Sequence, residues 1–385
     1  MRTPPSLCDA PCGHLFAIAA PARYGIAPSP KTVCANKLFL DKPGAKAQSS
    51  LAARGQVMLI AFWAVLPVFL IIGLGVMLRA RDILPDSAGK VLGIYVLKLA
   101  LPLLLLHVMA QADRSTLAHG GFWLGALGAP LVCYLLGYAG DRLFCRRGSG
   151  AAVISALGCS ACNTAFVGLP IVEGLLPGNT EALVVAGLMT LTPNVVVIMG
   201  QVRLDLLNGV TAWEEGQSRV WILFRALVLG NPILLSTVAG LTLAVSGAGL
   251  WAPLDRACAL VGFTAAPCML IALGFDLGQK LRLALTRSVG HAFWRQAWLV
   301  SCKLILCPLI CWLIMAALDV TPLWLGVGVL TSATGSALVA SVLAQVYNAL
   351  PEEAALTAVL SNGVSLVSLT ACIWLLQYAG YFPGI

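Results

Sequence analysis

The sequence predicts an all-α integral membrane protein whose ten transmembrane helices form two inverted five-helix repeats, with helices 4 and 9 broken at a crossover. Three observations predict this fold. Apolar residues make up 59% of the 385 residues and charged residues only 10%, whereas soluble domains carry about 25% charged residues. Apolar stretches of about 20 residues, the length that crosses a bilayer, recur along the chain. The second half of the chain also repeats features of the first.

Residues 1–57 differ from the rest of the chain because they contain no sustained apolar run and no helical period. The apolar segment 15–20 is too short for a signal peptide, and Asp9 lies in the proline-rich segment before it. We interpret 1–57 as a disordered extension, or as the product of a mis-assigned start for a protein that begins near Met58.

The predicted spans begin at Met58. The first repeat covers 58–204, a cytoplasmic loop covers 205–224, the second repeat covers 225–379, and 380–385 form a short tail. The ten spans are 58–78, 90–110, 121–143, 151–171 and 182–203, followed by 225–246, 254–275, 296–317, 322–345 and 354–378. A very short link around Asp319 leaves nine or eleven spans as alternatives.

Basic residues predict the orientation of these spans. Loops after odd-numbered spans hold thirteen Lys and Arg residues, whereas loops after even-numbered spans hold only Arg114 and Arg256. Because basic loops stay in the cytoplasm, both chain ends are expected outside if the chain starts near Met58. The net charge of +8 is therefore a topology signal, and nucleic acid is not an expected partner.

An internal repeat is visible at an offset of 165 residues. Three residues of the first half recur in corresponding spans of the second: Pro67, Gly75 and Pro102 against Pro232, Gly240 and Pro267. Five spans per unit is an odd number, so the two units have opposite orientations, as in many secondary transporters. The alternative is that these prolines are independent kinks. We expect helix breaks at Pro102, Pro170 and Pro267.

Two spans contain small and polar residues at mid-span. The fourth carries Cys162, Asn163 and Thr164, and the ninth carries Thr334, Gly335 and Ser336. Broken helices at these positions would aim their N-terminal N–H groups at one place, which suits a carboxylate. These six residues are the predicted substrate-binding set. The alternative is that the small residues only allow helices to pack closely.

A few polar and ionisable residues inside the spans are candidates for the pathway or for coupling: His107, Lys98, Lys303, Asn194 and Asn362. The two lysines can extend to the interface or act as fixed cations. The histidine and the asparagines can pack helices together or line the pathway. No Asp or Glu is placed securely inside a span, so a carboxylate proton relay is not expected. Coupling to Na⁺, to H⁺ through His107, or to no ion stays open.

The thirteen cysteines do not form a pattern that predicts disulfides or a metal site. Most lie inside apolar stretches, where cysteine behaves as a small hydrophobic residue. Cys159 and Cys162 have CxxC spacing, but no second pair completes a zinc site. We expect unligated thiols, no bound metal and no cofactor.

Six segments in order resemble the auxin efflux carrier family, which joins plant PIN-type carriers and bacterial carriers related to malonate transporters. The segments are LPVFLIIGLGVMLRARDILP from Leu66, LPLLLLHVMAQAD from Leu101, CNTAFVGLPIVEGL from Cys162, GNPILLSTVAGL from Gly230, APCMLIALGFDLG from Ala266 and VASVLAQVYNALPEEAAL from Val339. The resemblance implies a ten-span inverted-repeat fold in which a transport domain moves against a scaffold in elevator fashion.

The resemblance also implies a substrate at the crossover of spans 4 and 9, where Asn163 matches the family's crossover asparagine and Thr164 stands beside it. PIN-type carriers have proline at the positions of Cys162 and Gly335, which argues against auxin itself as the substrate. The short loop 205–224 resembles that of bacterial members.

We therefore expect a secondary transporter, not an enzyme, that moves mono- or dicarboxylates such as malonate across a bacterial inner membrane by alternating access. The expected partners are this organic anion and the lipid bilayer, and a homodimer stays open. One alternative is a Na⁺-coupled symporter of larger amphipathic anions, resembling bile-acid symporters. An intramembrane enzyme or sensor is the alternative from another class. The sequence contains no HExxH, no pair of aspartates within the membrane and no GxSxG nucleophile motif.

Overall fold

The computed structural model describes residues 62–63, 65–112, 120–208, 232–285 and 293–382. Within these residues all regular secondary structure is helical, apart from one isolated backbone bridge. The all-helical prediction is therefore confirmed for this part of the chain. The predicted extension 1–57, residue Met58 and most of the predicted loop 205–224 lie outside the described residues.

Six helical stretches in the described residues are long and apolar enough to cross a membrane. They are Ala88–Ala110, Gly120–Leu143, Thr180–Leu207, Ala252–Gly278, Phe293–Ala317 and Pro351–Tyr378. Five shorter apolar helices accompany them, at Val65–Ala80, Ser149–Ser160, Thr164–Leu175, Pro232–Ser246 and Pro322–Ser332. A chain with this many long apolar helices is a multi-pass membrane protein.

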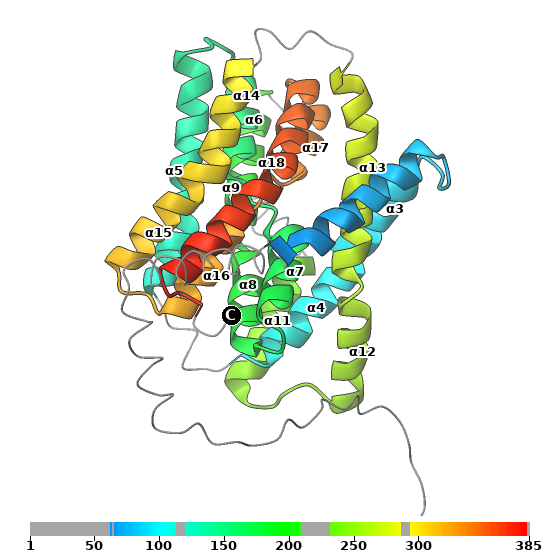
Figure 1. Cartoon of the computed structure of the whole chain (residues 1–385), viewed down its shortest axis with the longest axis vertical. Helices are drawn as coiled ribbons and strands as arrows, with labels where there is room; N and C mark the ends of the chain where they lie inside the picture. Colours follow the sequence, from blue (N-terminus) through cyan, green and yellow to red (C-terminus); the bar gives the residue numbers. More distant parts are fainter. Residues whose placement is uncertain (1–61, 64, 113–119, 209–231, 286–292, 383–385) are drawn as a thin grey trace, which may run out of the picture. The chain divides into compact units, whose positions relative to one another are not determined.

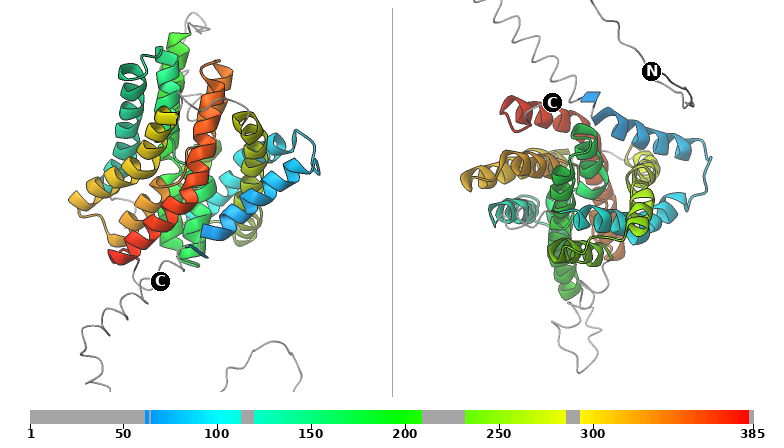
Figure 2. Two further views of the ribbon diagram at one scale, coloured as in Figure 1. Left: turned by 45° about the horizontal axis from the view of Figure 1, so that its top comes forward. Right: turned by 90° about the horizontal axis from the view of Figure 1, so that it is seen from below.

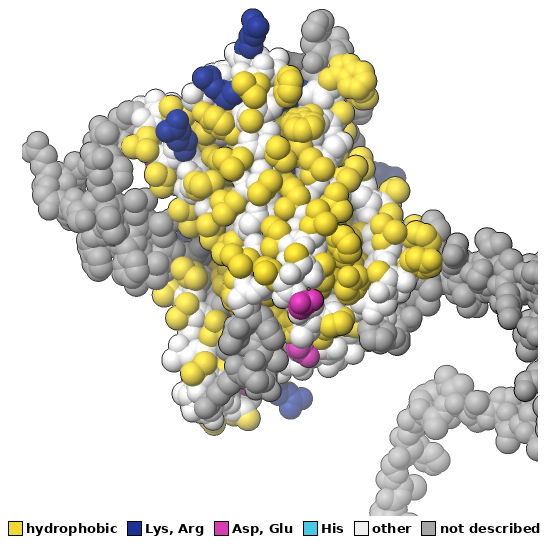
Figure 3. Space-filling model, turned by 90° about the vertical axis from the view of Figure 1, so that its left-hand side faces the viewer, with side chains coloured by type: hydrophobic (Ala, Val, Ile, Leu, Met, Phe, Trp, Pro, Cys, Tyr) yellow, Lys and Arg dark blue, Asp and Glu magenta, His cyan; other side chains and the backbone are white. Residues whose placement is uncertain are grey.

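The outer surface of the helices is apolar. Leu70, Leu135 and Val367 are between 62% and 70% exposed, and hydrophobic side chains cover most of the face drawn in Figure 3. Basic side chains gather at one end of that face. Soluble monomers rarely expose apolar patches of this extent, so the surface fits a bilayer.

Two groups of helices pack mainly within themselves. The first group comprises the helix Val65–Ala80, α3 (Ala88–Tyr95), η1 (Val96–Ala100), α4 (Leu101–Ala110), α11 (Pro232–Ser246), α12 (Ala252–Gly262) and α13 (Ala265–Leu285). The second comprises α5 (Gly120–Leu143), α6 (Ser149–Ser160), η3 (Thr164–Gly168), α7 (Leu169–Leu175), α8 (Thr180–Met189), α9 (Thr192–Leu207), α14 (Phe293–Ser301), η5 (Cys302–Leu306), α15 (Cys307–Ala317), α16 (Pro322–Ser332), α17 (Val339–Val346) and α18 (Pro351–Tyr378).

The two groups meet along a limited set of helices. In the views of Figures 1 and 2, helices α6 to α9 lie between α5 with α15 on one side and α3 with α13 on the other. Helix α13 contacts α18 and η3, and α4 contacts α8. The boundary between the groups therefore runs beside the broken fourth span.

Glycines allow the closest helix crossings in the first group. A Cβ added at Gly75 would collide with Ile271 O and lie 3.0 Å from Gly274 Cα on α13. A Cβ added at Gly240 of α11 would lie 3.0 Å from Leu106 O on α4. Since backbone atoms cannot move aside as a flexible side chain can, these crossings require glycine.

Three prolines follow widened, π-helical turns. The π-turns η1, η3 and η5 end two residues before Pro102, Pro170 and Pro308. Proline has no N–H, and its ring crowds the carbonyl four residues earlier. A wider turn accommodates both features without ending the helix.

Two of the predicted helix breaks are therefore wrong. At Pro102 the helix continues from Ala88 to Ala110 with a widened turn. Pro170 also stands inside a continuous helical stretch, Thr164–Leu175, and the true interruption precedes that stretch. Near Pro267 a two-residue turn at Phe263 and Thr264 divides the stretch Ala252–Gly278 into α12 and α13, and Pro267 lies in the first turn of α13, where proline is tolerated.

Candidate functional site

The fourth apolar segment is interrupted at the residues that the sequence singled out. Helix α6 ends at Ser160, Ala161 has an extended backbone with φ −73° and ψ 107°, and η3 begins at Thr164. In the ninth segment, α16 ends at Ser332 and α17 begins at Val339. Each segment is therefore two short helices joined by a few non-helical residues.

The two interruptions pair with one another. The Asn163 N–H donates to Gly335 O at 2.9 Å, and the Ala337 N–H donates to Ala161 O at 2.8 Å. Cys162 and Ser336 thereby form a short antiparallel bridge. Backbone N–H and C=O groups released by a broken helix must find partners when water is absent. Here some of the groups freed in each interruption pair with groups freed in the other. We call residues 161–164 and 333–338 the crossover.

Asn362 of α18 supports the crossover from one side. Its Nδ2 donates to Ser336 O at 2.9 Å and to Ala358 O at 2.8 Å, and its Oδ1 accepts from Asn163 Nδ2 at 3.3 Å. A Cβ at Gly335 would lie 2.6 Å from Asn362 Oδ1, so glycine permits this contact. Of the roles left open for Asn362, the contacts favour holding the two breaks together.

Two hydroxyl groups at the crossover have no partner among the described residues. Thr164 Oγ1 and Ser336 Oγ are buried without a hydrogen bond, and both side chains are fully shielded. An unsatisfied buried hydroxyl costs about 1–3 kcal/mol. Unsatisfied polar groups in a native fold call for an explanation, and a ligand held at the crossover would provide one.

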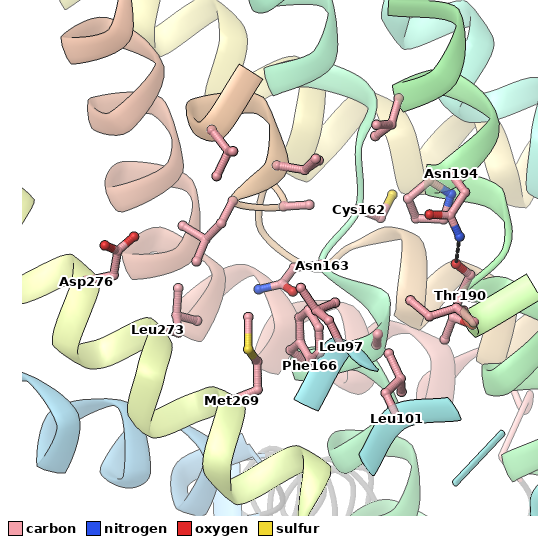
Figure 4. Close-up of a pocket in the computed structure, with 18 residues that line it drawn as sticks. Leu97, Leu101, Cys162, Asn163, Phe166, Thr190, Asn194, Met269, Leu273 and Asp276 are labelled. Atoms are coloured by element: carbon pink, nitrogen blue, oxygen red, sulfur yellow. Dashed lines mark hydrogen bonds between the residues drawn. The ribbon is translucent and has the colours of Figure 1, made fainter. Parts of the chain in front are cut away.

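A cavity of about 360 Å³ opens beside the crossover (Figure 4). Asn163 and Cys162 line it from the crossover, Thr190 lines it from the turn between α8 and α9, and Asn194 lines it from the first turn of α9. The other lining residues are mostly apolar: Leu97, Leu101, Ala165, Phe166, Pro193, Val197, Ile233, Met269, Leu273, Asp276, Ala337, Leu338, Val339 and Val342. The cavity is thus mainly apolar, and its polar groups are the amides of Asn163 and Asn194, the Thr190 hydroxyl and the Asp276 carboxylate.

Both groups of helices contribute to this cavity. Leu97, Met269 and Leu273 come from the first group, and Asn163 and Phe166 come from the second. In Figure 4 the Asn163 amide lies near the middle of the residues drawn. A molecule in the cavity would therefore touch both groups of helices at once.

The predicted site residues separate into cavity and supporting positions. Cys162, Asn163 and Asn194 line the cavity, whereas Thr164, Thr334, Gly335 and Ser336 are not among its lining residues. Thr334 Oγ1 donates to Thr331 O at 2.8 Å. The ninth segment instead lines the cavity through four residues that follow Ser336, namely 337–339 and 342.

Three candidate residues lie away from the cavity lining. Lys98 is exposed on the helix surface in η1. Lys303 does not extend to the interface, which was one of the two roles left open for it. It is fully buried and donates from Nζ to Ser332 O at 2.7 Å. The His107 Nδ1 lies 2.6 Å from Asp255 Oδ1, which links α4 to α12.

Sequence reasoning missed two acidic residues. Asp276 lines the cavity from α13, where it shares a helix face with Met269 and Leu273, so the 3.6-residue period was the available signal. Asp141 is 1% exposed inside α5 and pairs with Arg295 at 2.7 Å. Asp141 lies in the last turn of α5, so this buried ion pair stands at the end of a predicted span.

Comparison with known proteins identifies related sequences. A family model described as "Membrane transport protein" matches residues 60–216 and 217–375. A protein of Rhizobium meliloti (strain 1021) named "Putative malonate transporter" is 26% identical over 327 residues. The match covers 83% of this chain and 97% of that protein.

Proposed function

Because the chain belongs to the membrane transport protein family, the auxin efflux carrier family that its motifs resemble, we propose that it is a secondary transporter of small organic anions. The substrate class is mono- or dicarboxylates, with malonate as the first candidate, since the related Rhizobium protein carries that name. The size and polar groups of malonate suit the cavity, whose volume is about 360 Å³.

The observation that carries this proposal is the pair of unsatisfied hydroxyls at the crossover. Thr164 begins a helical segment and Ser336 lies on the paired strand-like break. These two residues are not part of the cavity lining, but the neighbouring Asn163 is, and the N-terminal end of a helix adds partial positive charge there. A carboxylate bound beside Asn163 would lie next to hydroxyl groups that the described residues leave unpaired.

Reciprocal helix packing supports two inverted repeats, 58–204 and 225–379. Gly75 lies against α13, and Gly240, its counterpart 165 residues later, lies against α4. Helix α13 carries Pro267, the counterpart of Pro102 on α4. The first helix of each repeat therefore crosses the second helix of the other repeat. Two units related by a pseudo-two-fold axis would produce this pattern.

Ten spans follow from combining helices of different length. Six stretches cross by length alone, and Val65–Ala80 and Pro232–Ser246 add two more. The broken segments, α6 with η3 and α7, and α16 with α17, each cross as a pair of short helices. We propose that this multi-pass protein lies in a bacterial inner membrane, with basic loops on the cytoplasmic side and, if the chain starts near Met58, both ends outside.

The arrangement in two helix groups supports alternating access as the mechanism. The second group holds the crossover and is tied together by Arg295 of α14, which pairs with Asp141 of α5 and with Glu353 of α18. Movement of this group along the first would carry an anion beside Asn163 from one membrane face to the other. The limited contacts between the groups suit such sliding.

One observation favours a second candidate. Most of the cavity lining is apolar, which also suits a larger amphipathic anion carried together with Na⁺. Stimulation of uptake by Na⁺ would distinguish that symporter from the first candidate.

Uptake into proteoliposomes tests the proposal. We expect saturable uptake of radiolabelled malonate or of a short or auxin-like monocarboxylate by the purified full-length protein. Asn163→Ala removes a hydrogen bond to a charged ligand, so uptake should fall by about tenfold to a hundredfold. Asn208→Ala, which changes an exposed asparagine at the end of α9, should leave it unchanged. No saturable uptake of any of these acids, together with no effect of Asn163→Ala, would refute the proposal.

A further inference from the structure

Lys303 is buried behind the crossover. Its side chain is 0% exposed, and its Nζ donates to Ser332 O at 2.7 Å. Ser332 is the last residue of α16, so the amine lies against the carbonyl end of a broken helix. That end carries partial negative charge, which stabilises the ammonium form.

The same carbonyl links Lys303 to the cavity. Cys162 Sγ also donates to Ser332 O, at 3.7 Å, and Cys162 lines the cavity beside Asn163. One shared acceptor therefore separates the ammonium from the space where an anion would bind. In a site shielded from water, charges at such short range interact far more strongly than in bulk solvent.

No described carboxylate neutralises Lys303. The side chains that act on it electrostatically include the thiols of Cys162, Cys307 and Cys133, and the buried Asp141 is already paired with Arg295. A buried ammonium without a counter-ion is costly. The positive charge is thus balanced only in part by the helix end and is available to a bound anion.

We propose that Lys303 is the resident cation of the crossover. In carriers with broken helices, the carbonyl ends of half-helices commonly hold the coupling Na⁺, and here the ammonium of Lys303 takes that place. It balances the carboxylate bound beside Asn163, so anion binding needs no Na⁺. This inference rests on the proposed function, and it makes Lys303 a positioning residue that acts through Ser332 and the crossover.

Lys98 provides a matched control. Like Lys303, it lies in a π-turn followed by a proline, but its side chain is exposed. A general effect of removing a lysine from a transmembrane helix would appear at both positions. An effect confined to Lys303 would identify the charge at the crossover.

Thermal unfolding of the full-length protein in detergent tests the proposal, with malonate as the probe and NaCl compared with choline chloride at equal ionic strength. We expect malonate to stabilise the wild type equally in both salts. Lys303→Met should weaken malonate binding by about tenfold or more in choline and regain part of it in NaCl, since Na⁺ can enter the vacated place. Lys303→Arg should retain binding without Na⁺, and Lys98→Met should match the wild type.

The proposal is overturned if the wild type needs Na⁺ to bind malonate, or if Lys303→Met binds malonate in choline as the wild type does. Should Lys303→Met fail to fold, Lys303→Gln removes the charge and keeps a hydrogen-bond donor. If malonate stabilises no variant in either salt, the choice of malonate under the proposed function fails. In that case thermal unfolding in NaCl and in choline chloride without malonate tests the role of Lys303. Stabilisation by Na⁺ of Lys303→Met but not of the wild type supports the proposal, and the lack of such stabilisation overturns it.

Discussion

Asn163 and Asn362 occupy different positions at the crossover although both are buried amides. Asn163 lines the cavity, whereas Asn362 is absent from the lining and uses its amide on Ser336 O, Ala358 O and Asn163. The first is placed to meet a ligand, and the second fixes the backbone that presents it. Their contrast depends on which element each faces, which residue type alone does not determine.

The substitution Gly335→Ala, which adds one methyl group, tests whether Asn362 supports the crossover. The Cβ of Gly335→Ala would lie 2.6 Å from Asn362 Oδ1 and 2.8 Å from Asn362 Cα, so Asn362 must move. We expect the free energy of unfolding to fall by about 1–3 kcal/mol, together with reduced uptake of labelled malonate in proteoliposomes.

Gly363, which follows Asn362 on α18, supplies the control for Gly335. A Cβ at Gly363 has no neighbour within 4 Å, so Gly363→Ala should be neutral or should stabilise by up to about 1 kcal/mol through helix propensity. Equal stabilities of the two variants in thermal unfolding would contradict the tight contact between Gly335 and α18.

Residue types inside the spans were predictable, but their partners were not. The sequence marks Lys303 and His107 as unusual within apolar stretches, and it leaves several roles open for each. Burial of Lys303 against Ser332 and the contact of His107 with Asp255 arise from segments 29 and 148 positions apart. Pairings over such separations are set by helix packing, which local sequence does not encode.

At the scale of helices, composition correctly predicted the two interruptions, but the prediction that helices break at Pro102 and Pro170 was wrong. Small and polar residues around Asn163 and Gly335 mark two true breaks. Pro102 and Pro170 instead follow π-turns within continuous helices. A helix in hydrocarbon must keep its backbone hydrogen-bonded, and widening by one residue achieves this where an open break would not.

The crossing of the helix Val65–Ala80 with α13 gives a prediction at this scale. In Gly75→Ala the new Cβ would collide with Ile271 O and lie 3.0 Å from two further backbone atoms of α13. Since backbone cannot rotate away, the helices must separate, and we expect about 1–3 kcal/mol of destabilisation. Thermal unfolding in detergent measures the change.

Gly73 lies on the same helix, and a Cβ added there would have no other atom within 4 Å. Gly73→Ala should therefore leave stability unchanged or raise it slightly. If Gly75→Ala is as stable as Gly73→Ala, the close crossing that supports the repeat is not present in the folded protein.

For the whole molecule, hydropathy and motif order predicted a helical membrane protein of the auxin efflux carrier family, and both are confirmed. The cavity could not be predicted in detail, because its walls come from helices of both groups, including η1, α9, α11 and α13. The paired interruptions were foreseeable as two separate breaks. Their backbone pairing through Asn163 and Gly335 became visible only in three dimensions.

The central claim is that the crossover carries one anion at a time between the two membrane faces. Counterflow tests it most directly: proteoliposomes are loaded with unlabelled malonate and exposed to a trace of labelled malonate. A carrier that alternates its access should accumulate label transiently above the external concentration, and Asn163→Ala should abolish the overshoot. Entry of label at the same rate into loaded and empty vesicles, with no overshoot, would contradict alternating access.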